Sequence, residues 1–92
     1  TISPGARSIV TVHYKGSLID GREFDNSYER SCPDALRLSD VIEGWQVALQ
    51  KMPVGDKWII YIPYTMGYGN KSVDSIPAYS TLVFEVKLLG VA

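Results

Sequence analysis

The sequence predicts an α+β domain in which a predominantly antiparallel sheet packs on a single helix. Several segments alternate apolar and polar residues with the period of a β-strand, whereas one short segment repeats its apolar residues with the period of a helix. The chain has 92 residues, and a chain of this size buries only about 60% of its unfolded surface, so the core must be compact and single. We therefore expect residues 1–92 to form one domain.

Strands are predicted by the alternation in residues 8–16, 56–64 and 81–89. The last segment is the clearest, because its even-numbered residues are all apolar and share one face. Asp20 and Gly21 follow the first segment and are typical of the tight turn of a β-hairpin. These strands are therefore expected to pair in an antiparallel sheet.

The helix is predicted in the segment VIEGWQVAL, residues 41–49. The apolar residues that recur at the spacing of one helix face are Val41, Trp45, Ala48, Leu49 and Met52. Gly44 lowers helix stability by roughly 1 kcal/mol relative to alanine, so the pattern and not the propensity predicts this helix. Trp45 raises the question of whether this face only fills a core or also forms the floor of a site.

Three stretches lack both periods, namely 25–35, 51–56 and 63–80. The last is long for so small a domain and contains two glycines and two prolines. Long ordered loops on small domains usually have a function. We therefore expect residues 63–80 to contribute to a site.

Charge and residue counts exclude several classes of protein. The formal net charge is −1, which offers no electrostatic attraction for nucleic acid or an anionic membrane. No apolar run approaches the roughly 20 residues that span a bilayer, so we expect no membrane insertion.

Cys32 is the single cysteine, which excludes an intrachain disulfide and a thiolate metal cluster. His13 is the single histidine and lies on the strand face opposite Tyr14, which leaves too few partners for a metal site or a Ser-His-Asp arrangement. The segment GYGNKS lacks the ending of a phosphate-binding loop. We expect neither a metal nor a cofactor.

Aromatic residues are the remaining signal, with six tyrosines, two tryptophans and two phenylalanines. Trp58 is assigned to the core. Five others come from five separate segments: Tyr14, Phe24, Trp45, Tyr68 and Phe84. They either fill the core or converge on an apolar pocket, which is the commonest kind of ligand site.

The chain begins with TISPGARSIV, without an initiator methionine, a signal peptide or a lipid-attachment cysteine. This beginning indicates a domain taken from a longer protein. A domain with so few cysteines folds equally well in the cytosol or the periplasm, so composition leaves the compartment open.

Five segments, in order, resemble the signature blocks of the FKBP-type peptidyl-prolyl cis-trans isomerases. They are VTVHYKGSLIDGREFDNS, VIEGWQVAL, MPVGDKW, YIPYTMGYG and IPAYSTLVFEVKLL, and they cover essentially the whole chain from Ile9 onward. The resemblance implies a twisted antiparallel sheet wrapped around one short amphipathic helix, with the active pocket between them.

The resemblance also implies which residues form that pocket. Its wall would consist of Tyr14, Phe24, Val41, Ile42, Trp45, Tyr68, Ile76 and Phe84. Trp45 would be the floor, with Gly44 as a small residue beside the ring. Asp25 matches the pocket acid of the family, and Arg30 matches the ion partner of that acid.

The implied function is peptidyl-prolyl isomerase activity, which accelerates X-Pro bond rotation in proline-containing polypeptides during folding. No covalent bond is broken, so the family mechanism needs desolvation and hydrogen bonding and no nucleophile. The donors would be the backbone N–H of Ile42 and the hydroxyl of Tyr68. The alternative is a proline-peptide-binding or chaperone module with incidental isomerase activity, which would have the same pocket. The presence of both Asp25 and Tyr68 favours the enzyme.

Two segments depart from the eukaryotic pattern of the family. Asp34 stands where an aromatic wall residue usually follows the proline, and the loop 70–76 is short and polar. Both departures resemble the bacterial, cell-envelope branch, which favours the periplasm or cell envelope and leaves the cytoplasm open. Because a charged side chain keeps its water, we expect macrolides such as rapamycin to bind with reduced affinity.

Overall fold

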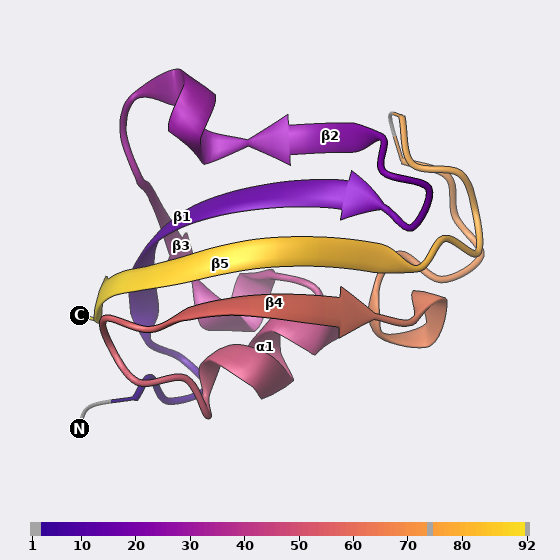
Figure 1. Cartoon of the computed structure of the whole chain (residues 1–92). Coiled ribbons are helices and arrows are strands. Elements are labelled where there is room, and N and C mark those ends of the chain that lie inside the picture. The colour runs from indigo at the N-terminus through magenta and orange to yellow at the C-terminus, as the bar shows by residue number, and fades with distance from the viewer. Residues whose placement is uncertain (1–2, 74, 92) are drawn as a thin grey trace.

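The computed structural model of the protein describes residues 3–73 and 75–91; residues 1–2, 74 and 92, which belong to the expected domain, lie outside the described residues. The elements in chain order are β1 (Ile9–Leu18), β2 (Glu23–Asn26), the 3₁₀ helix η1 (Ser27–Arg30), β3 (Asp34–Arg37), η2 (Leu38–Asp40), α1 (Glu43–Leu49), β4 (Lys57–Ile62), η3 (Tyr64–Met66) and β5 (Leu82–Val91) (Figure 1). The predicted α+β class is confirmed.

The strands form one antiparallel sheet with the order β2-β1-β5-β4. β1 pairs along its whole length with β5, from Val10 opposite Val91 to Leu18 opposite Leu82. On its other side, β1 pairs with β3 near its beginning and with β2 near its end. β1 therefore organises the sheet, and β4 lies at the edge beside β5.

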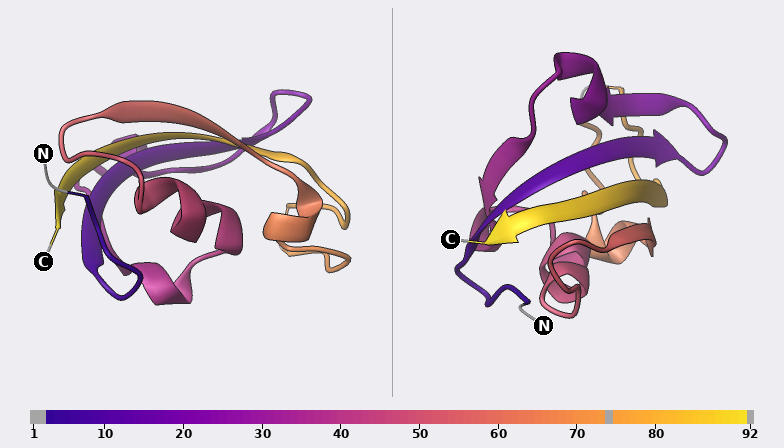
Figure 2. Two further views of the ribbon diagram at one scale, coloured as in Figure 1. Left: turned by 90° about the horizontal axis from the view of Figure 1, so that it is seen from below. Right: turned by 60° about the vertical axis from the view of Figure 1, so that its left-hand side comes forward.

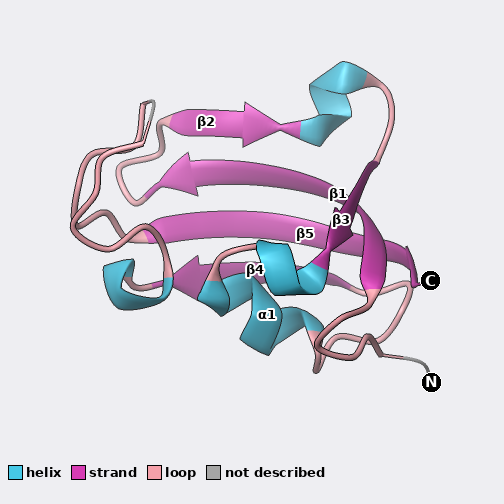
Figure 3. Cartoon of the chain, turned by 180° about the vertical axis from the view of Figure 1, so that it is seen from behind, coloured by secondary structure: helices cyan, strands magenta, loops and turns pink. Residues whose placement is uncertain are grey.

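The core lies between α1 and the concave face of the sheet. The sheet curves over α1 (Figure 2, left), and the view from behind places α1 in front of the strands (Figure 3). The buried apolar residues are Val10, Val12, Leu18, Leu38, Trp45, Leu49, Met52, Ile62, Ile76, Leu82, Phe84, Val86 and Leu88. Each fully buried side chain of this kind contributes roughly 1.5–3 kcal/mol, so the contact between helix and sheet supplies much of the stability.

The strands predicted from alternation are confirmed as β1, β4 and β5, with Leu82, Phe84, Val86 and Leu88 of β5 buried as expected. The hairpin turn is also confirmed. Gly21 has a φ of +94° and its N–H donates to the Leu18 carbonyl oxygen over 2.9 Å. A left-handed residue at this point requires glycine or a similarly permissive residue.

The prediction that residues 25–35 are irregular is wrong. β2 extends through Asn26, η1 follows, and β3 begins at Asp34. The β3 sequence Asp-Ala-Leu-Arg contains no β-branched or aromatic residue, so its own propensity for a strand is low. Pairing with Ile9–Val12 of β1 imposes the extended conformation.

The helix is shorter than its apolar pattern. Val41 is extended, with φ −97° and ψ 169°, Ile42 is the N-cap, and α1 ends at Leu49. Met52 follows the helix and is nevertheless fully buried. The apolar spacing therefore marked one buried side of the segment, of which the helix covers only a part.

Gly44 allows α1 to approach β4 closely. A Cβ atom at this position would lie 2.7 Å from Cγ2 of Ile62 and 2.8 Å from its Cγ1. The small residue is therefore needed against Ile62, whereas the resemblance placed it beside the indole ring of Trp45. This close approach compensates for the poor helix propensity of glycine.

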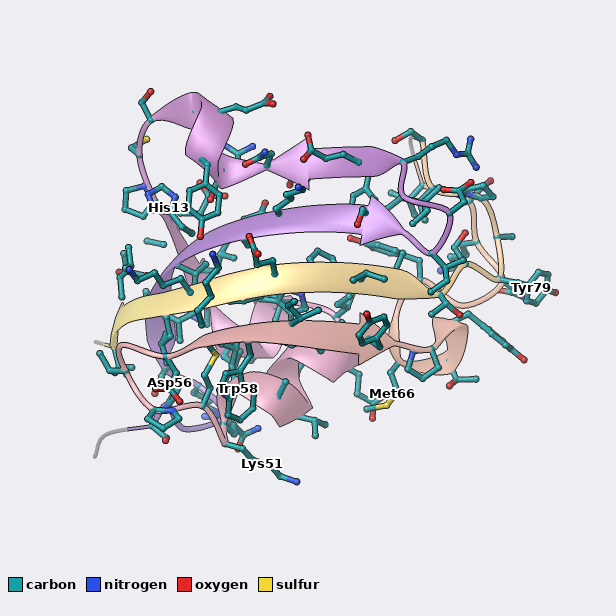
Figure 4. The ribbon with its side chains drawn as sticks, in the orientation of Figure 1. His13, Lys51, Asp56, Trp58, Met66 and Tyr79 are labelled. Atoms are coloured by element: carbon teal, nitrogen blue, oxygen red, sulfur yellow. The ribbon has the colours of Figure 1, made fainter. Side chains whose placement is uncertain are left out.

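Trp58 was assigned to the core and is partly buried, packed against the core from β4. Figure 4 shows it beside Asp56, to whose Oδ2 the indole N–H donates over 3.3 Å. It takes no part in the cavity described below.

We predict that Gly44→Ala lowers the free energy of unfolding by about 1–3 kcal/mol, because a methyl group overpacks a contact that cannot relax freely. Alanine is the better helix former by roughly 1 kcal/mol, so the opposite sign would be expected without this contact. Urea denaturation of wild type and variant measures the difference.

Gly90→Ala is the matched control, since a Cβ atom there would meet nothing within 4 Å. It should change stability by less than about 0.5 kcal/mol. Combining Gly44→Ala with Ile62→Ala should cost less than the two single losses added together. A Gly44→Ala variant as stable as wild type would contradict the proposed contact.

Candidate functional site

A cavity of about 360 Å³ opens between α1, the sheet and the segment 63–80. It is lined by Tyr14, Phe24, Asp25, Leu36, Asp40, Val41, Ile42, Trp45, Tyr68, Val73, Ser75, Ile76 and Phe84. These residues come from β1, β2, β3, β5, α1 and the loops, so the cavity exists only in the folded chain. Its walls are mostly apolar and aromatic, as in a typical small-molecule or peptide site.

The floor of the cavity is a set of rings in edge-to-face contact around Trp45. The ring centroids of Tyr14 and Phe84 lie 5.1 Å and 5.2 Å from that of Trp45, at interplanar angles of 87° and 90°. Phe24 makes the same kind of contact with Phe84, at 5.5 Å and 85°. Such pairs each add about 0.5–1.5 kcal/mol beyond burial, which holds the floor rigid.

Gly16 of β1 lies directly under two of these rings. A Cβ atom at this position would be 2.7 Å from Cε1 of Phe84 and 2.8 Å from Cε1 of Phe24. The absence of a side chain therefore lets both rings settle against the strand.

A polar group borders the aromatic floor at one side. The hydroxyl of Tyr14 donates to Oδ2 of Asp25. Nη1 of Arg30 donates to Oδ1 of Asp25 over 2.7 Å, and Nη2 of Arg30 donates to Oδ2 of Asp34 over 2.8 Å. One guanidinium thus joins two carboxylates, a geometry for which arginine is well suited.

This polar group alters the ionisation of its members. Burial alone would raise the pKa of Asp25, but the hydrogen bonds from Tyr14 and Arg30 outweigh burial and hold that pKa below its usual value. Burial and the hydrogen bond to Asp25 raise the pKa of the Tyr14 hydroxyl well above its usual value. Asp25 therefore stays ionised and Tyr14 stays protonated at neutral pH.

Ser27, the first residue of η1, anchors the backbone of Tyr14. Ser27 is fully buried, and its Oγ accepts from the Tyr14 N–H over 2.7 Å. Nδ1 of His13 lies 2.9 Å from the same Oγ, and the His13 ring stacks on Tyr28 at 4.7 Å. Figure 4 shows His13 on the side of the sheet near η1. The Ser27 hydroxyl is thus held by the Tyr14 backbone and by His13, an arrangement that fixes this part of β1.

The N-terminal end of α1 provides a backbone N–H that makes no hydrogen bond within the described residues. Ile42 lines the cavity, and none of the hydrogen bonds among residues 3–73 and 75–91 uses its N–H. The preceding residue is held in place by Gln46, whose Nε2 donates to the Val41 carbonyl oxygen over 2.7 Å.

The segment 63–80 contributes to the cavity as expected for a long loop, through Tyr68 and the stretch around Ile76. Val73 and Ile76 bond to each other through their backbones, over 2.9 Å and 2.7 Å. Asp74, part of the loop 70–76 judged short and polar, lies outside the described residues. Tyr79 adopts a φ of +61° and projects at the end of the molecule away from His13 (Figure 4).

The structure brings the expected site residues together. The eight wall residues and Asp25 line the cavity, and Arg30 contacts it through Asp25. Asp34 does not line it; its carboxylate turns to Arg30, and Leu36 borders the cavity from the same strand.

Sequence reasoning missed four lining residues: Leu36, Asp40, Val73 and Ser75. Alternation along β3 would have suggested Leu36, had that strand been recognised. The other three lie in segments without a periodic signal.

Within the described ranges, no group of three or more His, Cys, Asp or Glu side chains is placed to hold a metal ion. Over the same residues, no helix is both long and apolar enough to cross a membrane. Cys32 is exposed and is a free cysteine.

Comparison with known proteins assigns the sequence and the fold to one family. A family model described as FKBP-type peptidyl-prolyl cis-trans isomerase matches residues 1–89. The chain is 52% identical over 82 residues to the FKBP-type peptidyl-prolyl cis-trans isomerase FkpA of Buchnera aphidicola, a match that covers 89% of this chain and 34% of the relative. It is 48% identical over 89 residues to the FKBP-type 22 kDa peptidyl-prolyl cis-trans isomerase of Escherichia coli, with 96% of this chain and 43% of the relative covered.

The fold agrees with these sequence matches. The crystal structure of FkpA from Escherichia coli superposes with a TM-score of 0.93 at 48% identity and covers 97% of this chain and 42% of that chain. The chain spans about a third of the length of the first of these curated relatives. The bacterial branch expected from the sequence is confirmed by these relatives.

We predict that Asp25→Asn destabilises the protein by about 1 kcal/mol at pH 7, since the lost charge-assisted bonds lie at a partly exposed site. A carboxyl with a folded pKa below its unfolded value stabilises the fold above the unfolded pKa, and this contribution disappears as pH falls through the folded pKa. The difference between wild type and variant should therefore shrink between about pH 5 and pH 2.

Urea denaturation at several pH values measures this difference. Glu29→Gln, which changes an exposed acid of the neighbouring η1, is the control and should shift stability by less than about 0.5 kcal/mol. A difference between wild type and Asp25→Asn that is constant with pH would show that folding does not lower the pKa of Asp25.

Proposed function

This chain belongs to the family of FKBP-type peptidyl-prolyl cis-trans isomerases, and we propose that its cavity catalyses rotation about the peptide bond that precedes proline in other polypeptides. The observation that carries the proposal is the rigid aromatic floor around Trp45, bordered by an ionised carboxylate and an unused backbone N–H. The substrates would be proline-containing polypeptides.

The reaction has a barrier of about 18–20 kcal/mol because resonance gives the C–N bond partial double-bond character. The planar amide is more polar than the twisted one, and water stabilises the planar form by solvating its charge separation. The apolar walls of the cavity exclude this water when an X-Pro segment enters. Desolvation therefore favours the twisted state without the formation of a covalent intermediate.

Hydrogen bonds add to this effect. The Ile42 N–H would donate to a carbonyl oxygen of the substrate, and the Tyr68 hydroxyl would be a second donor. Both residues line the cavity. Each 1.36 kcal/mol by which the barrier falls corresponds to about a tenfold gain in rate.

Asp25 would act electrostatically. As the amide twists, resonance is lost and the carbonyl carbon gains positive character, which an ionised carboxylate stabilises. Arg30 and Tyr14 hold the carboxylate in one orientation, so no reorganisation is needed during the reaction. A proton need not be transferred at any step.

The alternative of a proline-peptide-binding or chaperone module remains testable by activity. A binding module would bind X-Pro peptides in the same cavity without accelerating their exchange. Exchange measured by NMR in short proline peptides, with and without the protein, separates the two, since uncatalysed exchange takes tens to hundreds of seconds.

Macrolides such as rapamycin would bind this cavity with reduced affinity. The position after Pro33 carries Asp34, whose carboxylate is paired with Arg30, so no aromatic side chain closes that border.

We predict that Ile42→Pro lowers kcat/KM about fivefold on a neutral X-Pro peptide, because it removes one hydrogen-bond donor worth on the order of 1 kcal/mol. Proline fits the backbone, since Ile42 has φ −59° and Val41 is extended, as a residue before proline must be. Isomerase activity by NMR exchange and stability by urea denaturation are measured together.

Ile42→Val and Ile42→Ala control for the loss of side-chain contact, because both retain the N–H. A folded Ile42→Pro variant as active as Ile42→Ala would rule out the backbone donor while leaving the isomerase activity itself intact. Complete inactivity of wild type on X-Pro peptides would instead exclude the enzyme.

We predict that Asp34→Phe lowers the Kd for rapamycin roughly fivefold, since one added aromatic contact is worth about 0.5–1.5 kcal/mol. Asp34→Asn is the control, because it removes the charge without adding a ring and should bind like wild type. Calorimetric titration of the three proteins decides the matter. Equal affinities for Asp34→Phe and Asp34→Asn would mean that the path of β3, and not the side chain, leaves this border open.

A further inference from the structure

The cavity carries an unbalanced negative charge. Two carboxylates line it, Asp25 and Asp40, and no lysine, arginine or histidine is among the lining residues that the structure describes. An excess of one sign at the mouth of an apolar cavity attracts ligands of the other sign, because low-dielectric walls focus the field.

Asp25 has a cationic partner, whereas Asp40 has none within residues 3–73 and 75–91. Arg30 pairs with Asp25 and with Asp34 at the same time, so its single positive charge is shared by two carboxylates. Asp40 makes no ion pair or side-chain hydrogen bond within residues 3–73 and 75–91. Arg37, three residues before it, donates instead to the Arg7 carbonyl oxygen over 3.2 Å.

The position of Asp40 leaves its carboxylate available to a bound peptide. Asp40 ends η2, is exposed, and borders the cavity, so it lies at the rim. It stands two residues before Ile42, whose N–H is the proposed donor to the substrate carbonyl. A peptide held by Ile42 would therefore pass close to this carboxylate.

We propose that Asp40 makes the cavity selective for prolines that have a lysine or arginine beside them in the sequence. This inference rests on the proposed isomerase function and adds a substrate class to it. The cationic side chain pairs with Asp40 at the rim while the proline ring enters the apolar interior. Because the pair is solvent-exposed, its effect is modest, roughly two- to fivefold in kcat/KM.

The test uses capped peptides that differ only beside the proline. Lysine, its uncharged analogue norleucine, or glutamate is placed directly before the proline in one series and directly after it in another. The catalysed exchange rate per enzyme is measured by NMR well below KM, where it is proportional to kcat/KM. The readout is the ratio of lysine to norleucine and of glutamate to norleucine within each protein.

Three variants accompany wild type. Asp40→Asn removes the charge and should bring both ratios close to one in the series that responds. Asp40→Lys should invert the order, so that glutamate exceeds norleucine and norleucine exceeds lysine. Glu43→Lys makes the same change of net charge at an exposed acid that does not line the cavity, and should keep the wild-type order. Added salt should weaken the lysine preference of wild type.

The inference is overturned if lysine and norleucine give equal rates in both series with wild type, or if Asp40→Lys keeps the wild-type order. It is also overturned if Glu43→Lys inverts the order as strongly as Asp40→Lys, since net charge and not Asp40 would then be responsible. Turnover of the norleucine peptides by wild type shows that the isomerase function stands in each of these cases.

Discussion

The close contact between Gly44 of α1 and Ile62 of β4 determines where the cavity can form. Because the helix approaches the sheet without a side chain between them, the next residue, Trp45, is pressed against the rings of Tyr14 and Phe84. The indole is 3% exposed, and its N–H is buried without a partner among the described residues. Leaving this N–H without a hydrogen bond costs roughly 1–3 kcal/mol. The ring nevertheless occupies this position, where it forms the floor of the cavity. The same packing of Trp45 therefore fills the core and forms the floor of the site. The helix face that contains Trp45 has both roles.

β1 links this packing to the polar border of the cavity. Along one strand, Tyr14 supplies a ring to the floor and a hydroxyl to Asp25, while Gly16 leaves room for two further rings. Just beyond β2, Ser27 fixes the backbone of Tyr14. A ring that serves both the floor and the carboxylate must be positioned accurately, and the strand is held by β5 on one side and by β2 and β3 on the other. The site is therefore built on the most firmly paired element of the sheet.

The electrostatics suit a reaction without proton transfer. Hydrogen bonds keep Asp25 charged, and burial together with the hydrogen bond to Asp25 keeps Tyr14 neutral, so both remain in a single ionisation state around neutral pH. General acid–base catalysis requires instead a group with a pKa near the working pH. The cavity thus offers fixed charges, a backbone donor and the exclusion of water, which are the means by which a bond rotation can be accelerated. Asp40 adds a charge at the rim of the cavity and Asp34 adds one beside it, and we propose that both affect which ligands bind.

Local sequence patterns determined the strands β1, β4 and β5, the hairpin at Gly21 and the buried side of the helical segment, because period and turn chemistry are properties of neighbouring residues. The ordered motifs further identified the eight wall residues, Asp25 and Arg30, all of which the fold brings to one place. Only the tertiary structure decided that Asp34–Arg37 is a strand, that Asp34 turns to Arg30, and that Leu36, Asp40, Val73 and Ser75 reach the cavity. The extent of α1 and the partner of Gly44 were likewise settled by packing. The physical reason is the same in each case: these features arise from contacts between segments far apart in the chain, and such contacts leave no period in the local sequence.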